Sequence, residues 1–556
     1  MVAELIRAHP DQPALILAPS AKRCDAMLED LRSTLGSEIS AERLCAFPRH
    51  DTLPYDRFSP QPFLITARTH VLYRWLECSS PKRSPSPPAP IVVADWTALS
   101  NRVPSRESFG RHVHRLQVGQ TLDRESWLKE IHEAGYQRMP LVEEKGELAV
   151  RGGIVDFFPP QSTHPLRVEF FGDEIDSIRE FDPASQRSLK KRDQVTLIPA
   201  REILLGRSQV VESEGLLREL AETCKANTEE TTSLIDSLLR GDLPPGTEAL
   251  APILIPAMED VLDYLPSQSL VILDDPEAGL DRLSRYHEEA EASHAAALAS
   301  GRLICPPDQL LATPDTIQSA LSVRRSLSLE RIEGHDTEDA TPSILIPTEN
   351  HDDLRRELSA ARTHERALAP LADQLADWIL NDWRVNIAVT VLSAAERLRD
   401  LLDQYGIEAS TVTDQRPSWN WARPGKVEIR VTTLAEGFSL PMQKLAVITE
   451  EEIFGQRKKK RSKRGWKDGT ALEGLSQLQP GDHLVHREHG IGLYRGLQLL
   501  QTGRKDNELL CIEYAGEDKL FLPVHRLALV QRYGAFEGVA PKLDRLSKAY
   551  NRGKTK

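Results

Sequence analysis

The chain has few cysteines and no cysteine pair. Only six of its 556 residues are cysteine, and they are widely scattered: Cys24, Cys45, Cys78, Cys224, Cys305 and Cys511. Since no two of them form a CxxC pair, neither a zinc knuckle nor a disulfide framework is indicated. Reduced, buried thiols are expected, which fits a cytoplasmic protein.

Long apolar runs are also absent. No stretch of 18 apolar residues occurs, so the sequence predicts no membrane-spanning helix and no membrane partner. The first twenty residues lack a basic region followed by an apolar run, so no signal peptide is expected. Hydrophobic residues make up 40% and charged residues 28%, as in soluble globular domains, and 556 residues exceed what one core supports.

A phosphate-binding loop is missing as well. Such a loop needs Gly-x-x-x-x-Gly-Lys-Ser/Thr, because its backbone N–H groups surround the phosphates and its lysine neutralises them. Gly553, Lys554 and Thr555 supply the last letters, but Lys548 stands where the first glycine is required. The acidic pairs and triplets at 274–275 and 450–452 follow apolar runs, which is common on protein surfaces. We therefore expect no catalytic residue and no cofactor bound by this chain.

Three closely spaced histidines do not predict a metal site. His483, His486 and His489 lie in a segment whose pattern is that of strand and turn. Because successive strand residues point to opposite faces, a spacing of three places neighbouring histidines on different faces. The sequence therefore predicts no metal ligand.

Positive charge is scarce overall but locally concentrated. The formal net charge is −13, so the chain as a whole is not a nonspecific nucleic-acid binder. A predicted linker at 451–475 nevertheless holds six candidate nucleic-acid contacts: Lys458, Lys459, Lys460, Arg461, Lys463 and Arg464. A basic tail follows at 541–556. Two interpretations stay open for both segments, a solvated linker or a transient contact with duplex DNA or an acidic partner surface.

Apolar periodicity predicts a multidomain protein that combines α/β and α+β classes. In the region 1–104, apolar runs at 13–20, 44–47 and 91–94 alternate with helical patterns, as in an α/β domain with a parallel sheet. Hairpin patterns predict an α+β domain at 105–200.

The following regions continue this alternation. Region 201–340 is mainly helical in pattern, with one strand at 270–273. A second α/β domain is predicted at 350–450, where Ser393 and Glu396 are expected to form a capping box.

The last predicted domain, 476–540, is a small antiparallel β-barrel. Leu510, Ile512 and Tyr514 alternate with other residues, as a half-buried strand requires. Turn residues follow at 515–518, and then a second alternating run begins. Glycines among the preceding strands permit bends and bulges: Gly490, Gly492 and Gly496.

Three segments carry a family resemblance. The wording of 480–500, PGDHLVHREHGIGLYRGLQLL, resembles the RNA-polymerase-interacting module of bacterial transcription-repair coupling factors, which is related to CarD-type regulators. The pattern RGxxxDxFP at 151–159 resembles the UvrA-contacting domain that this family shares with UvrB. TLPYDRFSP, at 52–60, resembles the family's first domain, and the three segments occur in the family's order.

This resemblance implies a fold and two protein partners. It implies a UvrB-like N-terminal module that lacks a P-loop, and a Tudor- or SH3-like C-terminal barrel. It implies contact with UvrA through Arg151, Arg167 and Phe171. It also implies contact with the RNA polymerase β subunit through four further residues: Leu497, Gln498, Leu499 and Leu500. ATP and magnesium serve the DNA translocase motor of the family's full-length protein.

Strand alternation adds an expectation for each contact. Leu166 and Val168 share one face of their strand, and Arg167 and Phe171 share the other, so we expect Arg167 and Phe171 to be exposed. By the same argument Leu500 lies on the opposite face from Leu497 and Leu499. We expect Leu500 to be exposed at a strand edge, where a partner strand can pair.

The function that these features favour is an adaptor that links stalled transcription to nucleotide excision repair. One alternative is a UvrB-like or helicase-type ATPase that acts on damaged DNA, which requires the missing P-loop and helicase motifs. Another is a free-standing CarD-type transcription regulator, which leaves residues 1–475 without a role.

Overall fold

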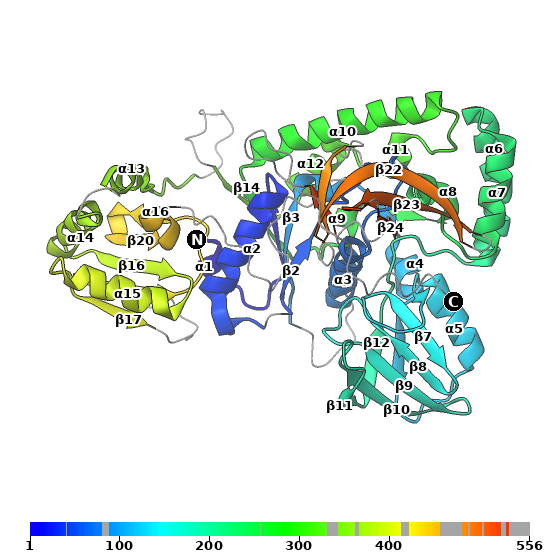
Figure 1. Cartoon of the computed structure of the whole chain (residues 1–556), viewed down its shortest axis with the longest axis horizontal. Helices are drawn as coiled ribbons and strands as arrows, with labels where there is room; N and C mark the ends of the chain where they lie inside the picture. The colour runs from blue at the N-terminus through cyan, green and yellow to red at the C-terminus, as the bar shows by residue number, and fades with distance from the viewer. Residues whose placement is uncertain are drawn as a thin grey trace.

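The computed structural model describes most of the chain and leaves several segments undescribed. The described residues are 1–40, 42–79, 88–255, 257–330, 343–361, 366–412, 422–455, 481–486, 490–502, 505–516, 518–523 and 530–532. Their main sheets are one parallel and one mostly parallel sheet with helices, an antiparallel-rich sheet and a small antiparallel sheet (Figure 1). In this described part, no helix is both long enough and apolar enough to span a bilayer.

The first sheet is parallel and joins distant parts of the sequence. Its order is β15-β14-β1-β3-β2, with β1 at Ala14–Ala18, β2 at Leu44–Phe47, β3 at Ile91–Asp95, β14 at Leu270–Asp274 and β15 at Ser326–Leu329. The predicted strands are confirmed here. β1 and β3 are fully buried, as expected of a sheet covered on both faces. The strand near 270 completes this sheet beside β1.

Helices of two regions accompany this sheet, and some of them pack in a separate cluster beside it. The first region contributes α1 (Val2–Ala8), α2 (Ala21–Leu35) and α3 (Pro62–Ser79). The predicted helical region contributes α6 (Arg207–Cys224), α7 (Thr228–Leu239), α8 (Ala251–Leu254), α9 (Val261–Tyr264), α10 (Pro276–Ala299), α11 (Pro307–Leu310) and α12 (Pro314–Ser322). Figure 1 shows α10 as a long helix that ends near the α6–α7 pair. Two short strands, β4 (Val103–Pro104) and β13 (Met258–Glu259), pair between the regions.

The predicted hairpin domain is a six-stranded sheet. Its order is β11-β10-β9-β8-β7-β6, with β6 at Gln137–Arg138, β7 at Glu147–Arg151, β8 at Ile154–Phe157, β9 at Leu166–Phe171, β10 at Glu174–Phe181 and β11 at Ser188–Arg192. Only β6 and β7 run parallel. Helix α5 (Arg124–Glu133) packs Trp127 and Ile131 into the core on one face. β5 (His114–Gln117) and β12 (Gln194–Leu197) pair separately, and α4 (Arg106–Arg111) precedes them.

The second α/β domain has the order β17-β18-β16-β20-β19. Its strands are β16 (Arg384–Val389), β17 (Ala409–Val412), β18 (Lys426–Val431), β19 (Phe438–Leu440) and β20 (Leu445–Thr449), and only β19 is antiparallel. Its helices are α13 (Asp352–Ala361), α14 (Ala369–Leu380), α15 (Leu392–Asp403) and α16 (Glu450–Phe454). The domain lies beside α1 and α2 (Figure 1), where the Ala435 N–H donates to Asp30 over 2.8 Å.

The predicted capping box of this domain was wrong. Helix α15 begins at Leu392 after Val391, which provides no side-chain cap, so Ser393 lies inside the first turn. A serine there cannot occupy the cap position, where the side chain accepts from N2 or N3. The capping box of the domain belongs to α16 instead, where Thr449 and Glu452 bond reciprocally.

The C-terminal sheet is antiparallel, with the order β24-β23-β22-β21-β25. Its strands are β21 (His483–His486), β22 (Gly490–Thr502), β23 (Lys505–Glu513), β24 (Lys519–Pro523) and β25 (Val530–Arg532). The predicted alternation is confirmed, because Leu510, Ile512, Tyr514, Leu520 and Leu522 are all buried in one cluster. β22 carries a register irregularity between Tyr494 and Gly496, where glycine has a φ of 107°. The basic residues 458–464 and the tail 541–556 lie outside the described residues.

Candidate partner-binding sites

The first candidate site is the face of the six-stranded sheet that is turned away from α5. Directly opposed residues of neighbouring strands share a face. The register therefore places Asp156 of β8, Arg167 of β9, Arg179 of β10 and Lys191 of β11 in one row across the sheet. Leu166 and Val168 face the core on the other side, as predicted. This row brings charged side chains of four strands onto one surface.

The prediction that Arg167 is exposed was wrong. Its side chain is only 17% exposed, and it forms a two-bond ion pair with Asp156, Nε to Oδ1 at 2.7 Å and Nη2 to Oδ2 at 2.8 Å. The guanidinium also lies 4.7 Å from the centroid of the Phe181 ring. Its hydrogen bonds to Asp156 outweigh burial and raise the pKa of Arg167. Strand alternation identified the face but could not identify this cross-strand partner.

Phe171 is exposed, as predicted, and Arg151 is exposed as well. The Phe171 side chain is 83% exposed at the end of β9, next to the turn at Gly172, which has a φ of 66°. Arg151 is exposed at the end of β7 and donates from Nη2 to the Pro140 carbonyl over 3.2 Å. The β7–β8 turn brings Gly153 against the Phe170 carbonyl, so both side chains stand at the same end of the sheet.

A buried ion cluster joins the C-terminal end of this domain to α3, and the sequence analysis missed it. Glu202 accepts from Arg68 Nε at 2.6 Å, and its other oxygen contacts His50 Nε2 at 2.8 Å. Arg68 is fully buried in α3 and also donates to the Pro48 and Ala98 carbonyls, both over 3.0 Å. Burial alone raises the pKa of Glu202, but the charges of Arg68 and His50 outweigh it and lower this pKa to about 2. An arginine within the apolar pattern of α3 was the available signal.

The second candidate site is the long strand β22 of the C-terminal sheet. β21 pairs with β22 only between Gly490 and Leu493, whereas β23 pairs with β22 as far as Thr502. Among the described strands, the stretch 496–502 therefore pairs on one side only. Leu500 stands opposite Asn507 in this register, and Gln498 is exposed. The side chains of Leu497, Leu499 and Leu500 lie outside the described ones.

The acidic segments that resemble magnesium-binding carboxylates have other partners. Asp274 pairs with Arg23 at 2.7 Å, and Asp275 accepts from the Ala278 N–H at the start of α10. Glu450 accepts from the Thr390 N–H and hydroxyl, and Glu452 caps α16. These carboxylates do not fit a nucleotide–magnesium site, because they already bind the protein's own donors and no phosphate-binding loop accompanies them.

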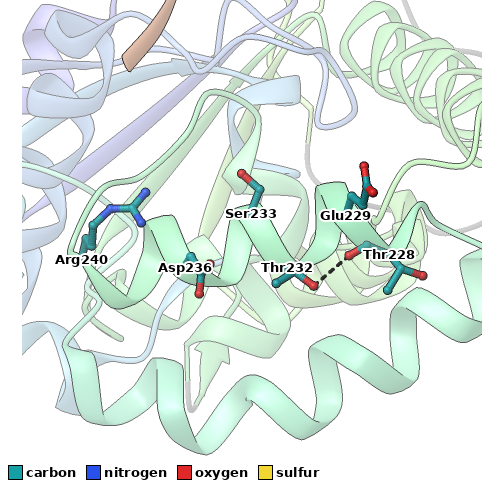
Figure 2. Close-up of a pocket in the computed structure, with 6 residues that line it drawn as sticks. All are labelled: Thr228, Glu229, Thr232, Ser233, Asp236 and Arg240. Atoms are coloured by element: carbon teal, nitrogen blue, oxygen red, sulfur yellow. Dashed lines mark hydrogen bonds between the residues drawn. The ribbon is translucent and has the colours of Figure 1, made fainter. Parts of the chain in front are cut away.

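Other features of the described residues do not form a chemical site. No group of three or more His, Cys, Asp or Glu side chains within that part of the chain could hold a metal ion, and His489 lies outside it. A shallow groove runs along α7, but this one helix and its C-cap residue Arg240 supply all of the lining residues (Figure 2). In that groove the Thr232 hydroxyl donates to the backbone carbonyl of Thr228 over 2.8 Å. We assign no ligand to it.

Three protein-family models match separate parts of the chain. The UvrB interaction domain matches residues 114–203, which hold the six-stranded sheet. The model described as MFD, D3 domain matches residues 382–453 in the second α/β domain. The CarD-like/TRCF RID domain matches residues 478–534, which hold the C-terminal sheet.

Curated relatives are similar over nearly the whole chain. A transcription-repair-coupling factor of Myxococcus xanthus is 33% identical over 551 residues, which are 96% of this chain and 44% of the relative. Proteins of the same name from Bacillus subtilis and Escherichia coli K12 are 28% and 27% identical, over 96% and 97% of this chain. The chain spans less than half the length of these relatives, and the similarity lies in their N-terminal part.

Proposed function

We propose that this chain, which is similar to the N-terminal part of transcription-repair-coupling factors, is an adaptor between RNA polymerase and UvrA. One observation carries the proposal: a UvrB interaction domain and a CarD-like/TRCF RID domain occur in one chain, on separate sheets with separate cores. Two binding modules on separate domains allow both partners to be held at once. Transcription-coupled nucleotide excision repair is the process that needs this link.

The proposed UvrA site is the charged face of the six-stranded sheet. Phe171 and Arg151 are exposed at the same end of that face, and an exposed aromatic beside an arginine is typical of interface hot spots. The ion pair of Arg167 with Asp156 holds strands β9 and β8 of this face together. All three residues belong to the proposal, with Arg167 in a positioning role.

The proposed site for the RNA polymerase β subunit is the one-sided stretch of β22. A strand edge with unpaired N–H and C=O groups is a template for a partner strand. Residues Leu497, Gln498, Leu499 and Leu500 lie on this stretch. We propose that the C-terminal sheet closes as a Tudor-like barrel around its buried cluster and presents this edge. Rows of main-chain hydrogen bonds then supply affinity, and the leucines supply specificity.

In this proposal the chain recognises its two partners and does not itself generate motor force. ATP and magnesium would serve a motor domain of the longer family proteins, because the carboxylates described above are engaged within this chain. The basic run 458–464 would add a transient contact with duplex DNA. The proposed location is the cytoplasm, where both partners act. Neither a helicase-type ATPase nor a free-standing CarD-type regulator gains support from an observation here.

A bridging experiment tests the adaptor function. Immobilised β subunit is incubated with UvrA, with or without the purified chain, and the retained UvrA is quantified. We expect UvrA to be retained only when the chain is present, in proportion to the chain bound. If the chain binds each partner separately but the two binding events exclude each other, the adaptor proposal is wrong. If it binds neither partner, both proposed sites are wrong.

A further inference from the structure

Two arginines stand side by side on the charged face, but they differ in what they already bind. Arg167 and Arg179 are directly opposed on β9 and β10. Arg167 uses two nitrogens on Asp156, whose side chain is only 2% exposed. To bind a partner, Arg167 would have to leave a buried carboxylate without its counter-charge, which is strongly unfavourable. Arg167 is therefore poorly suited to read a partner's charge.

Arg179 is held much more loosely. It makes one contact, from Nη2 to Glu169 Oε2 at 3.2 Å, and both side chains are about one-third exposed, at 34% and 28%. Ser177 donates to the same Glu169 oxygen at 2.7 Å, so the carboxylate keeps a partner if Arg179 turns away. Partly exposed pairs with a single long contact contribute little to stability. Arg179 can therefore exchange Glu169 for a carboxylate of a partner at little cost.

Lys191 extends the same row to the edge of the sheet. It stands opposite Arg179 on β11, and all five residues of β11 are exposed. Among the described strands, β11 pairs only with β10. Within the row itself, three cations, Arg167, Arg179 and Lys191, stand beside one carboxylate, Asp156. The excess of two positive charges favours an acidic partner surface.

We propose that Arg179 and Lys191 recognise the negative charge of the partner by binding acidic side chains of UvrA, with Phe171 as the apolar anchor. We call this their charge-reading role. The inference rests on the proposed function, since it names the chemistry of the same partner site. Phe171 lies four residues along β9 from the row of Arg167 and Arg179, which is about 13 Å at 3.3 Å per residue. Both contacts fit within one interface of ordinary size, roughly 800 Å² on each partner.

A simpler role for the β11 lysines must be separated from this one. Lysines on edge strands prevent unwanted pairing with other chains. Lys190 serves that role as well as Lys191 does, but strand alternation turns it to the opposite face. Lys190→Ala is therefore the matched control, because it removes the same charge from the same strand without touching the proposed surface.

The test is a calorimetric titration of UvrA with the full chain and four variants. We expect Arg179→Ala to weaken binding by about tenfold or more and Lys191→Ala by about threefold. Arg179→Lys should recover part of the loss, and Lys190→Ala should bind like the wild type. The dissociation constant of the Arg179→Ala variant should also rise less steeply with salt, because a charge contact has been removed.

The outcomes separate this inference from the proposed function. If the wild-type chain does not bind UvrA, the UvrA part of the proposed function fails. If the wild type binds, but Arg179→Ala and Lys191→Ala both stay within twofold of it, the charge-reading role is wrong and the site itself stands. Equal losses for Lys190→Ala and Lys191→Ala would also overturn it, because the effect would then be independent of the face. Lys191→Glu, at a fully exposed position, tests the charge if an Arg179 variant fails to fold.

Discussion

At the residue scale, the ion pair of Arg167 and Asp156 decides what a substitution at Arg167 measures. Asp156 is 2% exposed, and Arg167 is its counter-charge. We expect Arg167→Ala to destabilise the six-stranded sheet by roughly 3–5 kcal/mol, since it leaves a buried carboxylate unpaired. Hydrogen exchange at the amides of β8 and β9 reports this local opening without requiring the whole chain to unfold. Weaker UvrA binding by this variant would then follow from a disturbed face.

Two comparisons check that explanation. Arg192→Ala removes an ion pair with Glu180 at the exposed edge, and we expect a cost below about 1 kcal/mol. Replacing both members of the buried pair, by Asp156→Leu with Arg167→Met, should recover most of the protection lost in Arg167→Ala. Unchanged exchange in the single variant would show that Asp156 does not depend on Arg167.

At Arg167 the sequence predicted the face of the strand but not the partner of the side chain. Period-two alternation placed Leu166 and Val168 in the core and Phe171 outside, and both are confirmed. It could not place Asp156 opposite Arg167, because these residues are 11 positions apart and the register of their strands depends on the connection between them. For the same reason the sequence did not indicate that Arg179 and Lys191 lie in the same row as Arg167.

At the element scale, the cluster of Glu202, Arg68 and His50 joins the domain of the six-stranded sheet to α3. Its pH dependence follows from the pKa of Glu202, which falls from an ordinary value near 4.5 to about 2. Because the folded-state pKa is the lower one, the stability from this carboxylate is fully present above about pH 4.5. It is lost as the pH falls toward 2. A shift of this size corresponds to about 3 kcal/mol at neutral pH.

Glu202→Gln tests this cluster. We expect the variant to lose about 3 kcal/mol at pH 7 and the gap to the wild type to shrink steadily between pH 5 and pH 2.5. The measurement is the melting temperature across this range, with hydrogen exchange of α3 to locate the change. Glu130→Gln is the control, since Glu130 contacts His114 at 3.5 Å but is 56% exposed. A gap that stays constant from pH 6 to pH 2.5 would show that the Glu202 charge is not the source.

The elements themselves were largely predictable, and their pairing was not. Apolar runs located β1, β2, β3 and β14, because strands buried on both faces are apolar throughout. Nothing local indicated that β14 lies next to β1, more than 250 residues earlier. The capping box at Ser393 failed for a related reason, since the helix begins two residues earlier than the local pattern suggests. Helix boundaries depend on tertiary contacts as well as on propensity.

At the scale of the whole molecule, the two proposed partner sites belong to separate units. The core of the six-stranded sheet and the core of the C-terminal sheet contain no residue in common. Distant substitutions without shared partners act independently. An adaptor of this design should therefore lose one partner at a time, which no single-site enzyme or single-partner regulator would do.

The last prediction uses this independence. We expect Leu500→Arg to abolish capture of the β subunit and to leave UvrA affinity unchanged. Phe171→Ala should weaken UvrA binding about tenfold or more and leave β capture unchanged. The physical reason for the first effect is that a charged side chain on the one-sided stretch of β22 opposes the docking of a partner strand.

Both variants are measured against both partners, and circular dichroism confirms that each is folded. If Leu500→Arg still captures β at the wild-type level, the docking edge lies elsewhere. If it unfolds the sheet, Leu500 belongs to the buried cluster and the face assignment is reversed. If either variant loses both partners, the two sites are coupled and the adaptor cannot work by simple linkage.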